Sequence, residues 1–155
     1  MATDFKCARC GRCCKKKKIN ITYSDVMRWE SEGRFDILSE VNLVQFKKDV
    51  DFTGFYFGKT ALREGCPFLL FDGVKTNCRI YETRPKCCRN QPECIEPNSD
   101  KLKNWKKCQG LQNRTQFNDA YFKEVRQDEY EDLRQIYIHI KQVFEIIRQA
   151  RIIDP

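Results

Sequence analysis

Residues 7–14, Cys7-Ala8-Arg9-Cys10-Gly11-Arg12-Cys13-Cys14, place four cysteines within eight residues. In a Cys-x2-Cys step, two sulfur atoms from one tight turn can reach the same metal ion, and Gly11 permits the turn. A further x2-Cys step brings a third sulfur to the same concave loop, as in iron–sulfur ferredoxin loops. Cys13 and Cys14 are adjacent, so we expect their side chains to point in different directions and to serve two neighbouring sites. The spacing predicts a metal-binding loop.

Six further cysteines provide candidate ligands outside this loop. Cys66 precedes Pro67, and ferredoxin-type loops take their next ligand from a distant Cys-Pro pair of this form. Ten thiols suffice for two four-sulfur sites with two cysteines left over. The remaining cysteines are Cys78, Cys87, Cys88, Cys94 and Cys108.

A disulfide framework or a set of free buried thiols is the competing interpretation of these cysteines. The first seven residues contain no apolar segment of the kind found in signal peptides. We therefore expect a cytoplasmic protein, and disulfides are rare in that reducing compartment. No stretch approaches the ~20 apolar residues that cross a bilayer, so no membrane partner is expected. Metal binding is favoured over disulfides.

The net charge of +7 is concentrated where the cysteines are. Residues 1–30 and residues 84–114 each contain eight Lys/Arg and three Asp/Glu, and together they hold eight of the ten cysteines. Cysteine ligands bind as thiolates, so a four-thiolate zinc site has a charge of about −2, which these cations would offset. The alternative is a nucleic-acid footprint that includes Lys15–Lys18.

The chain of 155 residues suits one compact domain. We expect an α+β, mainly helical fold, with a small cysteine-rich, metal-stabilised body, a short β-hairpin and a C-terminal helical tail. The cysteine-cluster domain is expected over residues 1–114. Residues 115–155 are expected to form a helical extension packed on the same domain.

Short sequence signals predict the elements of the first half of the chain. Thr22 or Ser24 can cap a helix that stops at Gly33, and apolar spacing predicts a second helix over residues 36–48. Aromatic residues over 52–57 indicate extended structure. Asp72-Gly73, between two strand-like runs, indicates a hairpin over residues 67–78.

The later elements are predicted in the same way. Arg84-Pro85 is expected to end a short turn of helix. Thr115 can cap a helical segment with Phe117, Tyr121 and Val125 on one face. Over residues 133–147, apolar residues three and four apart predict a longer helix with a core-facing stripe, the alternative being a dimer seam.

Other titratable and aromatic residues are given structural roles. We expect the single histidine, His139, to serve in packing or at the surface rather than as a ligand. The acidic stretch over residues 124–132 is expected to be a solvated helix face. We expect Trp29 and Trp105 to lie in the core or to shield a site from solvent. Tyr81, near Cys78, is expected to shield a cluster from water.

Several motifs in this order resemble the YkgJ-type cysteine-cluster family, which is named for its CxxCxxCC motif and described as a zinc- or iron-chelating domain. The resemblance covers residues 7–94. The motifs are the Cys7–Cys14 loop, Ile21-Thr22 with Asp25-Val26, Cys66-Pro67-Phe68-Leu69, Cys78-Arg79-Ile80-Tyr81-Glu82, Arg84-Pro85-Lys86-Cys87-Cys88-Arg89 and Pro92-Glu93-Cys94.

The resemblance implies eight metal-binding cysteines. Cys87 stands outside the family's Arg-Pro-x-x-Cys-Arg step and is an apparent extra. Cys108-Gln109-Gly110 resembles a Cys-Pro-Gly ending of the family with Gln in place of Pro, which makes Cys108 an optional ligand. The eight are Cys7, Cys10, Cys13, Cys14, Cys66, Cys78, Cys88 and Cys94.

These features lead to three functional hypotheses. The first is an iron–sulfur protein with one or two [4Fe–4S] clusters. It would transfer electrons to a protein partner or assist the maturation of a larger enzyme. Structural zinc is the alternative metal. The second is a cluster-dependent protein-lysine methyltransferase, implied by a larger relative in the family group, although this chain has no Gly-x-Gly spacing. The third is a zinc module that binds nucleic acid through its basic segments.

Overall fold

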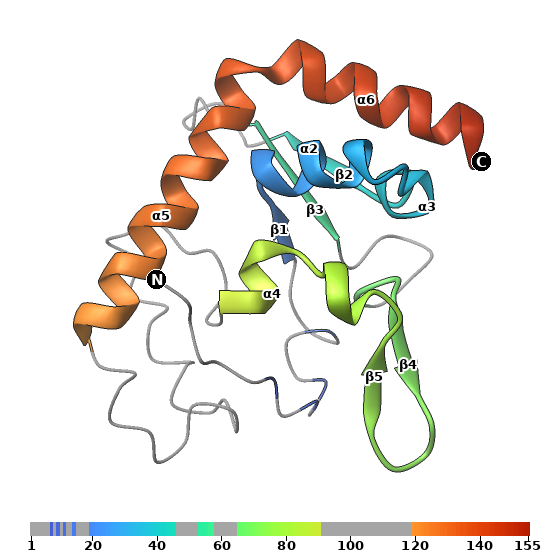
Figure 1. Ribbon diagram of the computed structural model, residues 1–155, viewed down its shortest axis with the longest axis vertical. Helices are drawn as coiled ribbons and strands as arrows, with labels where there is room; N and C mark the ends of the chain where they lie inside the picture. Colours follow the sequence, from blue (N-terminus) through green and yellow to red (C-terminus); the bar gives the residue numbers. More distant parts are fainter. Residues whose placement is uncertain are drawn as a thin grey trace.

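The computed structural model describes residues 7, 9, 11, 14, 19–45, 53–57, 65–90 and 119–155 (Figure 1). The described elements make up an α+β fold rich in helix, with a β-hairpin and a C-terminal helical region, and this confirms the predicted fold class. In chain order they are β1 (Ile19–Ile21), α2 (Tyr23–Ser31), α3 (Phe35–Leu38), β2 (Asn42–Gln45), β3 (Thr53–Phe57), β4 (Leu69–Phe71), β5 (Thr76–Cys78), a 3-10 turn (Tyr81–Thr83), α4 (Lys86–Asn90), α5 (Asp119–Ile138) and α6 (Ile140–Ile153).

A three-stranded antiparallel sheet in the order β1-β3-β2 lies at the centre. Ile19 pairs with Phe57 and Ile21 pairs with Phe55. Residues directly opposite each other in an antiparallel pair share one face, and these four side chains are all buried. The predicted extended segment over 52–57 is confirmed as β3 within the described residues.

Helix α2 begins where the sequence signal predicts, because Thr22 caps it. The Thr22 side chain accepts a hydrogen bond from the backbone of Asp25, and the Asp25 carboxylate accepts from the Thr22 backbone, which completes a capping box. Val26 and Trp29 project from this helix into the core and are fully buried. The Trp29 ring stacks on Phe57 of β3, with ring centroids 5.6 Å apart.

The predicted helix over residues 36–48 is wrong. Helix α3 ends at Leu38, and β2 runs from Asn42 to Gln45 with Leu43 opposite Phe55 of β3. A short apolar run has similar spacing in a helix and in a strand, so periodicity alone does not separate them. Pairing with β3 decides the conformation, because it supplies the backbone hydrogen bonds of this segment.

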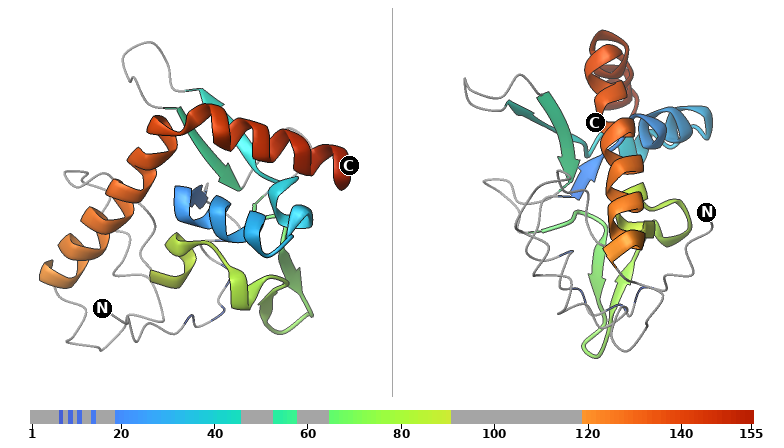
Figure 2. Two further views of the ribbon diagram at one scale, coloured as in Figure 1. Left: turned by 45° about the horizontal axis from the view of Figure 1, so that its top comes forward. Right: turned by 90° about the vertical axis from the view of Figure 1, so that its left-hand side faces the viewer.

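The C-terminal region forms two helices rather than the predicted continuous one over 133–147. His139 has non-helical backbone angles (φ −109°, ψ 27°) and separates α5 from α6. The chain turns there, so that α5 lies along one side of the molecule and α6 crosses over α2 and α3 (Figures 1 and 2). The buried residues on these helices include Ile136, Val143 and Ile147, which confirms the predicted core-facing stripe.

Candidate metal site

The β4–β5 hairpin carries Cys66 and Cys78 at its base. Leu69 lies opposite Cys78, and the Leu69 backbone N–H donates to the carbonyl of Cys66 at 3.3 Å. Phe68, which lies between Cys66 and Leu69 in the chain, is buried and packs edge-on against Phe57, with ring centroids 5.2 Å apart. The predicted hairpin is confirmed, and Phe68 anchors its base to the core.

The hairpin turn is formed by the predicted Asp72-Gly73. The Asp72 carboxylate accepts backbone hydrogen bonds from Val74 at 2.9 Å and from Lys75 at 2.7 Å. Gly73 has a φ of +95°, which few other residues adopt. The backbone N–H groups of Val74 and Lys75 in the turn are therefore satisfied by the Asp72 side chain.

The cysteine-rich loop contacts the hairpin through residues 9 and 11. The Thr76 hydroxyl donates to the carbonyl of Arg9, and the Arg9 guanidinium donates to Asn77 Oδ1 at 3.3 Å. Gly11 has a φ of +71°, and a Cβ atom there would lie 2.5 Å from Thr76 Cγ2. Gly11 is required both for the turn that the sequence predicts and for the close approach of the loop to β5.

Two pairs of predicted ligands come together in this way. The backbone N–H of Cys66 donates to the carbonyl of Cys14 at 2.7 Å. Cys7 and Cys78 are close enough to interact electrostatically, so these two cysteines lie in one neighbourhood. The N-terminal loop and the distant Cys-Pro pair are thus adjacent in space, although 52 residues separate Cys14 from Cys66.

Positive charge surrounds Cys78. Burial raises the pKa of the Cys78 thiol, and the nearby guanidinium groups of Arg84 and Arg9 oppose that effect. Both guanidinium groups also lie over the Tyr81 ring, at 3.9 Å for Arg84 and 4.7 Å for Arg9 from its centroid. Two cations from the two basic segments therefore flank one predicted ligand, as charge compensation requires.

Helix α4 carries Cys87 and Cys88 next to this region. Cys88 is half-buried against the core. Cys87 is buried and disulfide-bonded, so its sulfur is not available as a ligand, and at this cysteine the disulfide interpretation that the sequence disfavoured is the correct one. The cysteine that stands outside the family pattern thus differs chemically from its neighbour.

A buried carboxylate, Asp25, holds α4 in place. Its carboxylate accepts from the backbone N–H of Lys86, the first residue of α4, at 2.9 Å. Arg28 Nη2 lies 3.3 Å and Arg89 Nη2 3.8 Å from the same oxygen. Burial raises the pKa of Asp25, while the hydrogen bonds from Thr22 and Lys86 and the charge of Arg28 oppose this.

No role in the site is predicted for Asp25 from the sequence, where two signals point to it: its place in the family motif Ile21-Thr22 with Asp25-Val26, and its position three residues after Thr22. Its second role, at the start of α4, is invisible in the sequence because Lys86 lies 61 residues away. By joining α2 to α4, Asp25 positions the segment that carries Cys87 and Cys88.

The acidic stretch over residues 124–132 is only partly the solvated face that was predicted. Glu124 and Glu131 are exposed, but Glu129 is buried and Asp132 is half-buried. Asp132 accepts from the Ser24 backbone at 2.8 Å and from the Lys86 ammonium at 3.0 Å. These contacts attach α5 to α2 and α4.

The other structural roles follow the predictions where the residues are described. His139 packs against Tyr23, with ring centroids 4.8 Å apart. Trp29 is in the core and donates from Nε1 to the Thr83 carbonyl at 2.8 Å. Trp105 lies outside the described residues.

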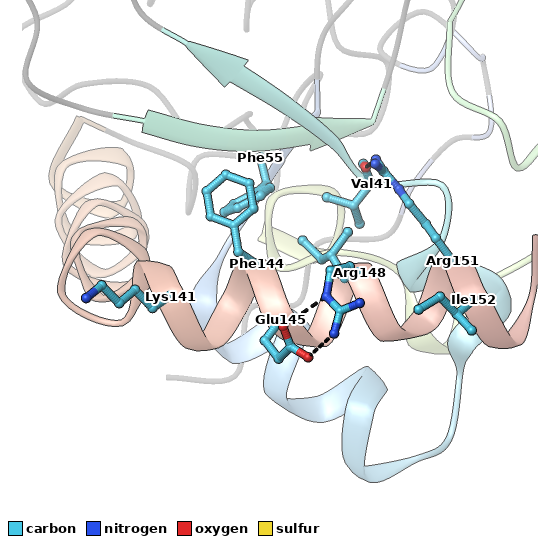
Figure 3. Close-up of a pocket in the computed structure, with 9 residues that line it drawn as sticks. Val41, Phe55, Lys141, Phe144, Glu145, Arg148, Arg151 and Ile152 are labelled. Atoms are coloured by element: carbon cyan, nitrogen blue, oxygen red, sulfur yellow. Dashed lines mark hydrogen bonds and ion pairs between the residues drawn. The ribbon is translucent and has the colours of Figure 1, made fainter.

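A separate groove of about 550 Å³ lies between α6 and the sheet (Figure 3). Phe144 of α6 packs edge-on against Phe55, with ring centroids 5.5 Å apart. Arg151 donates to the Val41 carbonyl at 2.6 Å, and Glu145 pairs with Arg148 at 2.6 Å. None of the described residues that line this groove is a cysteine.

Five of the predicted ligands are described, and all five are half-buried: Cys7, Cys14, Cys66, Cys78 and Cys88. Cys10, Cys13, Cys94 and Cys108 lie outside the described residues. Within the described part of the chain, no three potential ligand side chains are close enough to hold an ion by themselves. Thiols fit zinc or iron as ligands, and these five come from the loop, the hairpin and α4.

The cysteine motifs of the loop, the hairpin base and α4 define a class of protein, the small cysteine-cluster metal-binding domains. The chain belongs to the CxxCxxCC family, described as "Putative zinc- or iron-chelating domain", whose model matches residues 6–129. Comparisons with curated proteins and with solved structures found no match. Among the described residues, no helix is long and apolar enough to cross a membrane.

Proposed function

We propose that this protein is a cytoplasmic iron–sulfur protein that holds one or two [4Fe–4S] clusters. The thiolates of Cys7, Cys10, Cys13, Cys14, Cys66, Cys78, Cys88 and Cys94 would be the ligands, with Cys108 as an optional one. The role would be electron transfer, or assistance in the maturation of a larger enzyme, through a protein partner. A bound cluster would supply one-electron redox chemistry.

One observation carries this proposal over structural zinc. The carbonyl of Cys14, at the end of the three-sulfur loop, accepts a hydrogen bond from the backbone of Cys66, the cysteine of the remote Cys-Pro pair. A cluster loop of the ferredoxin type combines these same two parts. The hydrogen bond therefore brings together the two sequence features that favour iron–sulfur over zinc.

The residues of this chain would serve the cluster in two ways. Arg9 and Arg84 provide positive charge near Cys78, which stabilises thiolates against the cost of burial. Phe68 and Ile80, both buried, border the same hairpin with apolar side chains. The exposure of the site and its hydrogen bonds are among the factors that tune a cluster's potential.

Purification under anaerobic conditions tests the proposal. We expect a coloured protein with broad visible absorption, containing iron and acid-labile sulfide in equal amounts. Replacing Cys66 by Ser should remove most of the iron. A colourless protein that contains stoichiometric zinc and no labile sulfide would refute the iron–sulfur assignment and identify a structural zinc site.

A further inference from the structure

The tip of the β4–β5 hairpin presents apolar side chains to solvent. Leu70, Phe71 and Val74 are 47%, 64% and 84% exposed. Within the part of the chain that the structure describes, the two strands pair only with each other, and the hairpin projects from the body on the side away from α6 (Figures 1 and 2). Large apolar side chains that stay exposed at the end of a projecting hairpin commonly mark a binding surface.

The charges beside this tip are positive. Lys75 and Arg79 on the hairpin and Arg9 on the neighbouring loop are all exposed. The one carboxylate of the turn, Asp72, is already used by the backbone N–H groups of Val74 and Lys75. The surface therefore complements a partner that combines an apolar pocket with carboxylates at its rim.

The occupant is a protein rather than a lipid surface. A bilayer that received Leu70 and Val74 would also receive Asp72, which lies between them. The hydrogen bonds from Lys75 and Val74 lower the pKa of Asp72, so its carboxylate stays ionised. Moving that charge into the hydrocarbon region of a bilayer is costly, whereas at a protein surface the carboxylate can stay in water.

The tip lies close to the predicted ligands. Phe71 is directly opposite Thr76, and Thr76 is two residues from Cys78, so all three side chains share one face of the hairpin. The cysteine-rich loop contacts that face through Gly11 and Arg9. Leu70 lies on the other face, opposite Asn77, and by alternation Lys75 and Arg79 lie there too. A partner that holds the tip from both sides would therefore reach the thiol-bearing face through Phe71.

We propose that the hairpin tip, Leu70, Phe71 and Val74 with Lys75 and Arg79, is the docking surface for an acidic protein that exchanges electrons or metal with this site. Only the statement that electrons or metal are exchanged rests on the proposed function. The docking itself follows from the exposure and the charge of the hairpin.

The experiment uses the full chain with its metal bound. A photo-crosslinking amino acid at position 74, expressed in the native host, identifies the protein that contacts the tip, and that protein is then purified. It is titrated with the wild type and with the double variant Leu70→Ser/Val74→Ser. The control is Ile138→Ser/Ile153→Ser, which removes apolar side chains that are 62% and 58% exposed on α5 and α6.

We expect one acidic protein, whose binding weakens as salt is raised. Its affinity should fall at least about tenfold in the hairpin variant, or about 1.4 kcal/mol, and stay at the wild-type value in the control. Equal affinity for the hairpin variant overturns the proposal, as does the absence of any crosslinked protein that binds the wild type. Hairpin-dependent binding to phosphatidylserine–phosphatidylcholine vesicles instead of a protein also overturns it.

Metal content measured on the same samples separates this proposal from the proposed function. Hairpin-dependent binding by a chain that contains no iron would leave the docking surface standing and refute the iron–sulfur assignment. Full iron content with equal binding by both variants would refute the docking surface alone.

Discussion

At the scale of the residue, Asp25 is the side chain whose loss should disturb the site most without touching a cysteine. Replacing Asp25 by Asn removes a buried negative charge that accepts from Lys86 and faces Arg28 and Arg89. Hydrogen bonds to charged groups contribute about 1.5–3 kcal/mol each. We expect the free energy of unfolding to fall by about 2 kcal/mol or more, as measured by urea denaturation.

The matched control for this change is Asp36→Asn. Asp36 pairs with Arg34 at 2.8 Å, but both side chains are exposed. Exposed ion pairs contribute about 0–1 kcal/mol. An Asp25→Asn protein as stable as the Asp36→Asn protein would contradict the role of Asp25 as the joint between α2 and α4.

Gly11 gives a second prediction at this scale. Gly11→Ala adds a Cβ that would meet Thr76 at 2.5 Å, so the cysteine-rich loop must move away from β5. Gly73→Ala also places Ala at a positive φ, but nothing lies within 4 Å of its Cβ. Both variants should lose about 1–2 kcal/mol through backbone strain. Only Gly11→Ala should lose bound metal, measured as metal per chain; equal metal content in both variants would contradict this.

At the scale of the element, the attachment of α5 depends on Asp132. Burial raises the pKa of Asp132, but hydrogen bonds from Ser24 and the charge of Lys86 outweigh this and leave the pKa lowered. Because the pKa of Asp132 is lower in the folded state than in the unfolded state, the ionised carboxylate stabilises the fold at neutral pH. This stabilisation is lost as pH falls below about 4 and Asp132 becomes protonated.

We therefore expect Asp132→Asn to lower the free energy of unfolding at pH 7 and to make its decline below pH 4 shallower than in the wild type. Urea denaturation at a series of pH values measures both effects, with Glu131→Gln, on the exposed face of the same helix, as control. Metal loss in acid affects all three proteins. A decline in Asp132→Asn that parallels the wild type would contradict the assignment.

At the scale of the whole molecule, the fold has two parts that should respond differently to metal removal. The sheet and the helices α2, α3, α5 and α6 share buried apolar side chains such as Trp29, Phe57 and Ile136. The hairpin, the loop and α4 carry the five described candidate ligands. Metal binding stabilises the segments that supply its ligands.

Treatment with a chelator should therefore increase amide hydrogen exchange mainly over residues 65–90. Exchange in the buried stretch of α6, which includes Val143 and Ile147, should change little. Hydrogen exchange measured by mass spectrometry, with and without the metal, checks this. An equal loss of protection in both regions would show that the metal stabilises the whole fold as one unit.

Local signals predicted the elements whose determinants lie within a few residues. The cap at Thr22 and the turn at Asp72-Gly73 are set by nearby side chains and backbone, and both are confirmed. The extended structure predicted over 52–57 is also confirmed within the described residues, because the aromatic residues there favour the strand that β1 and β2 then pair with. The helix predicted over 36–48 was wrong because its alternative, β2, depends on pairing with β3. The break at His139 was missed because it depends on how α5 and α6 pack on the core.

The class of protein could be predicted from the sequence, because thiol ligands recur at spacings that short loops require, and the family match confirms it. The arrangement of the site could not. The contact of Cys14 with Cys66, the cations beside Cys78 and the bond from Asp25 to α4 all join residues far apart in the chain. Such contacts form only when the core brings the loop, the hairpin and α4 together, and no local spacing rule encodes that.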